Sequence, residues 1–285
     1  MVSVTNAIQR LEKSHMEESE FSAFEHRGWE RAAQPYHTYF GNLTIQSHGP
    51  LLDALNVRRG VRFLDVASGP GYLAASAAQR GADAVGVDFA ESMVDQARRI
   101  YPALTFRFGS AEDLPFPDEC VDAVGINFGM LHFSNPEKAL LEAFRVLRPG
   151  GKIGFTNWAT PDKAAGFAIV LKAIEAHGRM DVQLPPGPPL FRFSDWDECK
   201  RVLVEAGFLD PRVQEIGLTL QARAPGALFE MVRRGGVRVS AILNAQTPEA
   251  LDLIEKTITE GAARYESAGE VRIPMPCVLA SAAKP

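Results

Sequence analysis

The chain has few features of secreted, membrane-spanning or disulfide-stabilised proteins. It contains only three cysteines, Cys120, Cys199 and Cys277, and their wide spacing provides neither a disulfide framework nor a CxxC metal motif. No apolar run approaches the ~20 residues that span a bilayer. The polar stretch 1–20 lacks the apolar core of a secretory signal. We therefore expect a cytoplasmic protein without a membrane span.

Positive charge is not in excess either. Thirty Lys and Arg residues against 35 Asp and Glu residues leave a formal net charge of −5. A mildly acidic chain is not steered to the phosphates of DNA or RNA, so we do not expect a nucleic-acid partner. The sequence contains no internal repeat and no low-complexity tract. A homodimer is compatible with these features.

Short apolar runs alternate with helical segments from Val61 onward. Five apolar or β-branched runs predict strands, at 61–66, 84–88, 104–108, 121–126 and 152–157. Helices of about ten residues separate them, and this alternation predicts a parallel sheet that is covered on both faces.

The remaining segments predict additions to one core. Residues 1–60 are rich in helix-forming residues and predict an N-terminal helical lid, while 61–285 form a single core domain. After the proline-rich loop that begins at Pro185, we expect a helix over 194–207, a strand over 212–216, a helical substrate-cap insertion at about 217–247, a helix over 248–265 and a last strand over 271–280.

A glycine-containing turn follows the first predicted strand. It lies in the run Leu64-Asp65-Val66-Ala67-Ser68-Gly69-Pro70-Gly71-Tyr72, which leads from a strand into a helix. Gly69 and Gly71 have no side chain, so the backbone can turn tightly and a ligand can approach it closely. Ligands of open α/β sheets bind at this carboxyl edge, and the turn therefore predicts a ligand site.

Two acids near the turn restrict the ligand. Asp65 lies at the end of the first strand, where a carboxylate would repel a pyrophosphate but can pair with a cationic ligand. Asp88 ends the next strand, 17 residues after Gly71, and an acid there accepts hydrogen bonds from two ribose hydroxyls. S-adenosylmethionine (SAM) combines a ribose and a positive charge without a phosphate. A dinucleotide could use the same turn, with Ala74 at the third glycine position, so an NAD(P)-dependent oxidoreductase is the alternative.

The segment from about Val61 to Asn157 resembles the class I SAM-dependent methyltransferases. Within that class it is similar to the small-molecule group that includes the ubiquinone/menaquinone-biosynthesis enzymes (methyltransferase type 11). The matching stretches are 64–71, 86–93, 111–116 and 145–151. The resemblance implies a Rossmann-like α/β fold, with a mostly parallel seven-stranded sheet, an antiparallel last strand, helices on both faces and a helical lid.

The resemblance also implies an activity and its contacts. The enzyme would move a methyl group from SAM to an O, N or C atom of a small-molecule acceptor, such as a secondary metabolite or a quinone-like compound, and release S-adenosylhomocysteine. The implied cofactor contacts are Ala67, Gly69 and Gly71 at the methionine part and ribose, Asp88 at the ribose hydroxyls, Phe89 and Met93 beside the adenine, Ala111, Glu112 and Asp113 at the adenine edge, and Asn127 and Phe128 near the amino-acid part. In the lid, Tyr36, Tyr39 and Gln46 are candidates for a contact with SAM or substrate.

Methyl transfer from a sulfonium needs little chemistry from the protein. The reaction is an in-line displacement, so the protein mainly aligns the reactants and excludes water. A base is required only when the acceptor is a weak acid. His132, after the fourth strand, is the best-placed base candidate because histidine titrates near neutral pH, and His37 is a weaker one. For His132 we favour a structural, hydrogen-bonded role.

Several subclasses of methyltransferase lack their signatures here. Residues 127–130 do not form the Asn/Asp-Pro-Pro-aromatic turn of adenine methylases, and the Pro276-Cys277 pair is far from the position that cytosine methylases use. No acid cluster suits Mg²⁺, so we expect no metal. Residues 20–48, the loop 185–193 and the insertion should form the acceptor pocket, and the arginines of the insertion are interpreted as a solvated face. A non-catalytic protein of the same fold is the remaining alternative.

Overall fold

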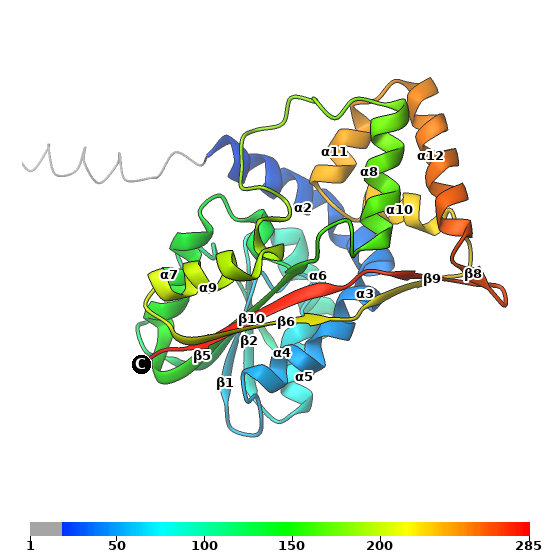
Figure 1. Ribbon diagram of the computed structural model, residues 1–285. Helices are drawn as coiled ribbons and strands as arrows, with labels where there is room; N and C mark the ends of the chain where they lie inside the picture. Colours follow the sequence, from blue (N-terminus) through cyan, green and yellow to red (C-terminus); the bar gives the residue numbers. More distant parts are fainter. Residues whose placement is uncertain (1–18) are drawn as a thin grey trace, which may run out of the picture.

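The computed structural model describes residues 19–285 (Figure 1). The first 18 residues of the predicted lid lie outside the described part. Among residues 19–285, no helix is long and apolar enough to cross a membrane.

A seven-stranded sheet forms the centre, in the order β3–β2–β1–β4–β5–β10–β6 (Figure 1). Its strands are β1 (Arg62–Val66), β2 (Asp83–Asp88), β3 (Thr105–Phe108), β4 (Val121–Asn127), β5 (Leu147–Trp158), β6 (Leu209–Ile216) and β10 (Cys277–Ala283). Strands β1 to β5 pair in parallel, and β10 pairs antiparallel with β5 and β6. This confirms the predicted mostly parallel sheet with an antiparallel last strand.

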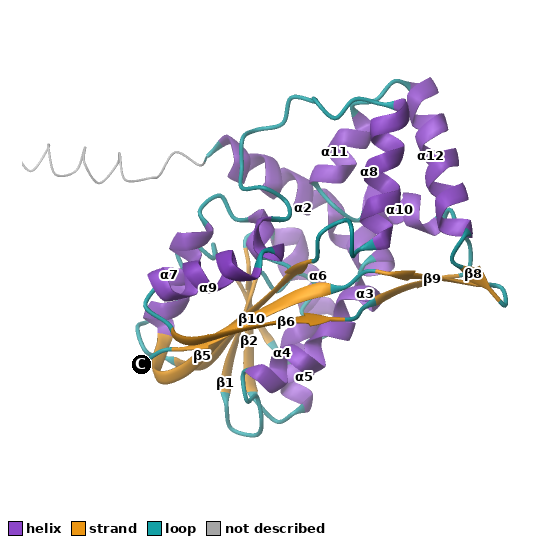
Figure 2. Ribbon diagram, in the orientation of Figure 1, coloured by secondary structure: helices purple, strands orange, loops and turns teal. Residues whose placement is uncertain are grey.

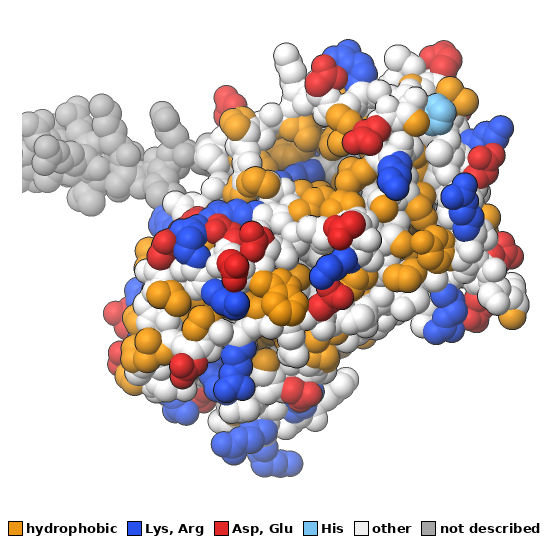
Figure 3. Space-filling model, viewed as in Figure 1, with side chains coloured by type: hydrophobic (Ala, Val, Ile, Leu, Met, Phe, Trp, Pro, Cys, Tyr) orange, Lys and Arg blue, Asp and Glu red, His pale blue; other side chains and the backbone are white. Residues whose placement is uncertain are grey.

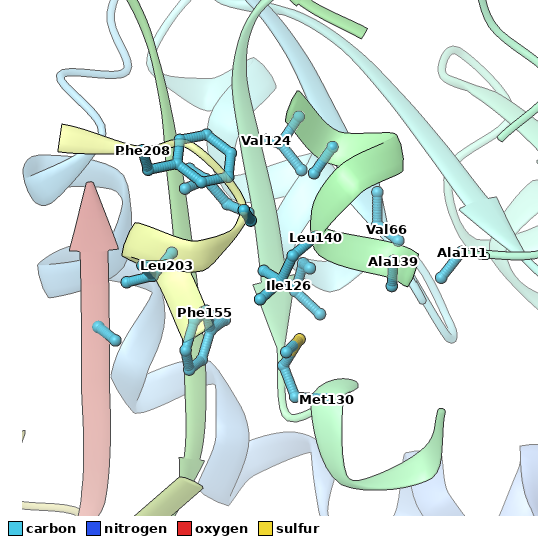
Figure 4. Close-up of a cluster of buried hydrophobic side chains, with 14 of the residues drawn as sticks. Val66, Ala111, Val124, Ile126, Met130, Ala139, Leu140, Phe155, Leu203 and Phe208 are labelled. Carbon is cyan, nitrogen blue, oxygen red and sulfur yellow. The ribbon is translucent and has the colours of Figure 1, made fainter. Parts of the chain in front are cut away.

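Helices cover both faces of the sheet, as predicted (Figure 2). On one face lie α4 (His48–Ala54), α5 (Tyr72–Gln79) and α6 (Glu91–Ile100), and on the other lie α7 (Pro136–Val146) and α9 (Trp196–Glu205). Successive strand residues supply the two cores: Phe63 packs with the first set of helices and Leu64 with the second. Figure 4 shows part of the second core, where Val66 and Ile126 from the strands meet Leu140 and Leu203 from the helices.

The lid and a cap lie above the carboxyl edge of the sheet. The lid consists of α2 (Glu20–Tyr39), α3 (Gly41–Thr44) and the 3₁₀ turn η1 (Ile45–Ser47). We call the following elements the cap: α8 (Ala165–His177), α10 (Ala227–Arg234), α11 (Arg238–Asn244), α12 (Pro248–Ala263) and a small sheet of β7 (Thr219–Ala222), β8 (Glu266–Ser267) and β9 (Glu270–Pro274). Two further 3₁₀ turns are η2 (Met130–His132) and η3 (Arg192–Ser194).

The cap departs from the sequence prediction in two places. The insertion at 217–247 is not entirely helical, because residues 219–222 form β7 and pair antiparallel with β9. The last predicted strand, 271–280, is divided into β9 and β10, which belong to different sheets. Pro274 is the last residue of β9 and Pro276 lies in the break, where a proline cannot continue a ladder because it has no N–H to donate.

Candidate functional site

The turn between β1 and α5 uses its two glycines for different purposes. Both have positive φ, +51° at Gly69 and +85° at Gly71, a region that L side chains rarely adopt. A Cβ on Gly71 would lie 2.5 Å from the Phe106 ring, so this position is closed by packing. A Cβ on Gly69 would meet only the Met93 sulfur, at 4.0 Å. Gly69 therefore leaves open space beside the turn.

Asp88 at the end of β2 is held by this turn. One carboxylate oxygen accepts a hydrogen bond from the Gly69 amide at 2.8 Å, and the other accepts from the Ala90 amide at 2.9 Å. The side chain is buried. Burial raises the pKa of Asp88 to about 6, although the two amide hydrogen bonds oppose the shift. Each oxygen keeps a second lone pair for a ligand hydroxyl.

Asp65 at the end of β1 lies at the same edge. Its carboxylate accepts a hydrogen bond from the Ala74 amide in the first turn of α5, at 2.9 Å. Burial raises the pKa of this carboxyl well above its usual range, and the nearby charge of Asp88 acts in the same direction. Two buried acids therefore share the carboxyl edge of the sheet, and hydroxyl donors or a cation would stabilise their ionised forms.

A cavity opens at this edge, beneath the lid and the cap. It encloses about 1420 Å³ of space, part of which is open to solvent. Figure 3 shows hydrophobic side chains around a hollow between the lid and the cap. Most of the predicted site residues line it, namely Asp65, Ala67, Gly69, Asp88, Phe89, Met93, Ala111, Glu112, Asn127, Phe128 and His132.

The other predicted residues do not line this cavity. Gln46 pairs with the backbone of Thr219 in β7, and the Nδ1 atom of His37 contacts the Tyr72 hydroxyl. Tyr39 packs against the apolar core of the cap. Gly71 is enclosed by Phe106, as described above, and Asp113 is exposed beside the cavity. A contact of these five residues with a ligand stays a prediction.

Two polar residues on the cavity wall also connect segments of the chain. Asn127 at the end of β4 accepts hydrogen bonds from Ser47 of the lid at 2.7 Å and from Thr156 of β5 at 2.6 Å. Glu112 accepts one from the Ser134 hydroxyl at 2.9 Å and one from the Asn135 amide at 2.9 Å. Any ligand contact that they make is therefore combined with a structural role.

One wall of the cavity is aromatic. Tyr36 stacks on Phe40 with 5.6 Å between ring centroids. The centroid of the Trp158 ring lies 4.1 Å from that of Phe128 and 5.3 Å from that of Phe167. The Tyr36 hydroxyl donates to Thr44, and burial raises the pKa of Tyr36 to about 12. All of these residues line the cavity. They form an apolar chamber with few polar atoms.

Sequence reasoning did not single out Phe40 and His48. The first could have been found, because Tyr36, Phe40 and Thr44 recur every four residues, the spacing that places side chains on one helix face. His48 carries no comparable signal. It is buried against the Ser76 hydroxyl, and burial lowers the pKa of its ring to about 4, so it lines the cavity as a neutral side chain.

The arginines of the insertion do not converge on an anion site. Arg234 pairs with Glu230 at 2.7 Å on the surface of α10, and Arg233 lies over the Phe229 ring. Arg238 is different, because it points inward, lines the cavity and pairs with Glu25 of the lid. Within residues 19–285, no group of three His, Cys, Asp or Glu side chains is placed to hold a metal ion.

Comparison with known families adds a second kind of evidence. The family described as methyltransferase domain matches residues 64–155. We call residues 64–155 the methyltransferase domain, after the family that they match. A second family, the protein-L-isoaspartate(D-aspartate) O-methyltransferases, matches residues 2–105. The methyltransferase domain contains both buried acids, the glycine turn and the loops that carry Glu112 and Phe128.

Curated relatives match the same methyltransferase domain over a limited length. The demethylmenaquinone methyltransferase of Beutenbergia cavernae is 44% identical over 118 residues, which are 41% of this chain and 49% of that protein. The chain thus spans about half the length of the curated relatives that it matches. The ubiquinone/menaquinone type that its motifs resemble is supported by these relatives.

Solved structures share the fold beyond the methyltransferase domain. The YcgJ protein of Bacillus subtilis is 21% identical, with a TM-score of 0.54 over 84% of this chain and 97% of that chain. Phosphoethanolamine N-methyltransferase 2 of Haemonchus contortus, solved with phosphomonomethylethanolamine and S-adenosylhomocysteine, is 19% identical, with a TM-score of 0.56 over 93% of this chain and 60% of that chain. At these identities the similarity establishes the Rossmann-like methyltransferase fold.

Proposed function

We propose that this protein is a SAM-dependent methyltransferase that acts on a small molecule. The observation that carries the proposal is the pair of buried acids beside an open glycine turn, inside a matched methyltransferase domain. A pyrophosphate would meet two carboxyl groups here, which disfavours the NAD(P)-dependent alternative.

The sheet edge suits the nucleoside part of SAM. Asp88 would accept hydrogen bonds from the ribose hydroxyls, because each of its oxygens has only one backbone donor. Gly69 would let the cofactor approach the turn, since a side chain there would enter the open space. Phe89 and Met93 would pack beside the adenine, and Asp65 would face the cationic end.

The aromatic chamber suits the methyl acceptor. Rings from the lid, β5 and α8 surround this chamber, which favours an apolar or planar acceptor such as a quinone-like compound. SAM would supply an activated methyl group. The chain would bind both reactants, align them and exclude water.

Calorimetry with SAM, S-adenosylhomocysteine and NADH tests this proposal. We expect micromolar binding of both adenosyl ligands, which corresponds to about −8 kcal/mol, and no binding of NADH. Tight NADH binding without SAM binding would favour the oxidoreductase instead. A release assay for S-adenosylhomocysteine over a panel of phenols, quinols and amines then tests turnover. SAM binding without turnover of any of them would favour the non-catalytic alternative.

A further inference from the structure

A buried network joins the lid, the methyltransferase domain and the cap beside the aromatic chamber. Glu25 of α2 is completely buried at its centre. One of its oxygens lies 2.8 Å from the Nδ1 atom of His132 in η2, and the other accepts from the Nε atom of Arg238 in α11, at 2.9 Å. These residues come from three segments that are distant in the sequence.

Arg238 is fixed on several sides. One of its terminal nitrogens donates to the Pro188 carbonyl at 2.6 Å, and the other donates to the Leu131 carbonyl. The guanidinium also lies over the Phe21 ring, 4.5 Å from its centroid. Because these contacts use all three nitrogens, Arg238 is committed to the protein. Its role is to compensate and orient the buried Glu25 carboxylate.

The network determines which nitrogen of His132 faces the chamber. An ionised carboxylate only accepts hydrogen bonds, so a neutral His132 ring beside an ionised Glu25 carries its proton on Nδ1 and keeps the lone pair on Nε2. Within the described residues, Nε2 has no hydrogen-bond partner. Nor is it one of the fully buried polar atoms without a partner, so it is not sealed inside the protein. His132 lines the cavity, and its side chain remains 17% exposed.

The imidazole ring is also held laterally. The Trp29 ring meets it edge-on, with 4.8 Å between centroids and 87° between planes. Its charged neighbours are Glu25 from the lid, Arg238 from the cap through Glu25, and Asp88 from β2, which interacts with it electrostatically. A hydrogen-bonded structural histidine does not need an unpaired nitrogen on a cavity wall, so this geometry favours the catalytic role over the structural one.

We propose that Glu25 is a positioning residue that orients His132 as the general base of methyl transfer, and that Arg238 holds Glu25 in place. The inference rests on the proposed function. Nε2 would take the proton of an acceptor O–H or N–H group as the acceptor atom bonds to the methyl carbon. The C–S bond breaks, and its electron pair stays on the sulfur of the released S-adenosylhomocysteine. The acceptor class is therefore one with a dissociable proton on the attacking atom or conjugated to it.

The arrangement has a structural consequence. The base is complete only when α2 and α11 both lie against η2, since Glu25 and Arg238 come from the lid and the cap. Opening either one would remove the group that orients His132, so the network would couple closure over the acceptor to competence for proton transfer.

Nitrogen-15 NMR of histidine-labelled protein, saturated with S-adenosylhomocysteine, tests the orientation without an acceptor. His132→Asn assigns the resonances. We expect one tautomer in the wild type, with the proton on Nδ1, and a mixture of tautomers in Glu25→Gln. A wild-type ring protonated on Nε2 alone, or an unchanged single tautomer in Glu25→Gln, would overturn the proposal. If the wild-type protein does not bind S-adenosylhomocysteine, that result would instead contradict the proposed function.

Kinetics with an acceptor found in the turnover assay test the catalytic role. We expect Glu25→Gln and His132→Asn each to lower kcat by at least ~100-fold, with KM for SAM unchanged and partial rescue by Glu25→Asp. His132→Asn leaves the Glu25–Arg238 pair intact and so controls for folding. The double variant should be no slower than either single one, because the residues act as a unit. If the kcat losses of the two single variants multiply in the double variant, Glu25 has no positioning role. Full kcat in a folded Glu25→Gln variant would show the same.

Discussion

The two halves of the cavity are built in different ways. At the sheet edge, the acids and the glycine turn lie within 25 residues of one another, and backbone amides hold the carboxylates in place. The aromatic half combines side chains from the lid, η2, the end of β5 and the cap, and it is held by contacts that side chains make across these segments. One half is therefore a local property of a strand–turn–helix unit, whereas the other exists only when distant segments are assembled.

The halves also differ in chemistry. The sheet edge offers buried oxygens to a polar ligand, while the other half offers aromatic faces and the His132 imidazole beside Glu25. We infer that changes at the edge will affect nucleoside binding, and changes in the lid and the cap will affect assembly and turnover.

The largest expected effect separates the two glycines of the turn. Gly71→Ala should lower the free energy of unfolding by about 2–5 kcal/mol, because it adds a left-handed alanine and a clash with Phe106. Gly69→Ala, the matched control, should cost only about 1–2 kcal/mol but should weaken S-adenosylhomocysteine binding more. Urea unfolding and calorimetry measure the two effects. The opposite order would mean that we have assigned the open and the closed glycine incorrectly.

The next largest effect concerns Asp88. Asp88→Ala should weaken S-adenosylhomocysteine binding by roughly 1.5–3 kcal/mol, because it removes the charged acceptor of the ribose hydroxyls. Glu112→Gln is a useful comparison, since that side chain is already committed to Ser134 and Asn135, and we expect a smaller loss. Calorimetry at pH 7.5 or so, where the Asp88 carboxyl is mostly ionised, is the measurement. Unchanged affinity in Asp88→Ala would remove this residue from the site.

This contrast also explains what could be predicted from the sequence. Asp88 and Gly69 were found because a strand end, a turn and a helix start are recorded in adjacent residues, and the alternation of strands and helices predicted the parallel sheet. The Glu25–Arg238 pair spans 213 residues, and the Gln46–Thr219 pair spans 173. No local pattern records such contacts. The break before β10 is an intermediate case, because its two prolines were visible but their effect on strand pairing was not recognised.

The pH dependence of binding provides a smaller effect with a defined sign. The pKa of Asp88 is raised to about 6 by burial, so its carboxyl is ionised above that pH and protonated below it. Only the ionised form accepts hydrogen bonds from both ribose hydroxyls. S-adenosylhomocysteine affinity should therefore fall as the pH drops from 7 to 5, by up to ~10-fold, since one unit below the pKa about a tenth of the groups remain ionised. Glu30 and His132 also interact with Asp88, so Asp88→Asn serves as the control and should show a flatter profile. An equally steep profile in that variant would assign the pH effect to another group.

The smallest expected effect on ligand binding distinguishes the lid from the sheet edge. Gln46 makes two hydrogen bonds of 3.0 Å with the backbone of Thr219, and so connects the lid to β7 of the cap. Gln46→Ala should lower the free energy of unfolding by about 1 kcal/mol and change S-adenosylhomocysteine affinity less than twofold. Gln46→Glu keeps one acceptor but replaces the donor to the Thr219 carbonyl, so it should be destabilised at least as much. A tenfold loss of affinity in Gln46→Ala, with stability unchanged, would show that this residue reaches the cofactor, and the lid would then belong to both halves of the cavity.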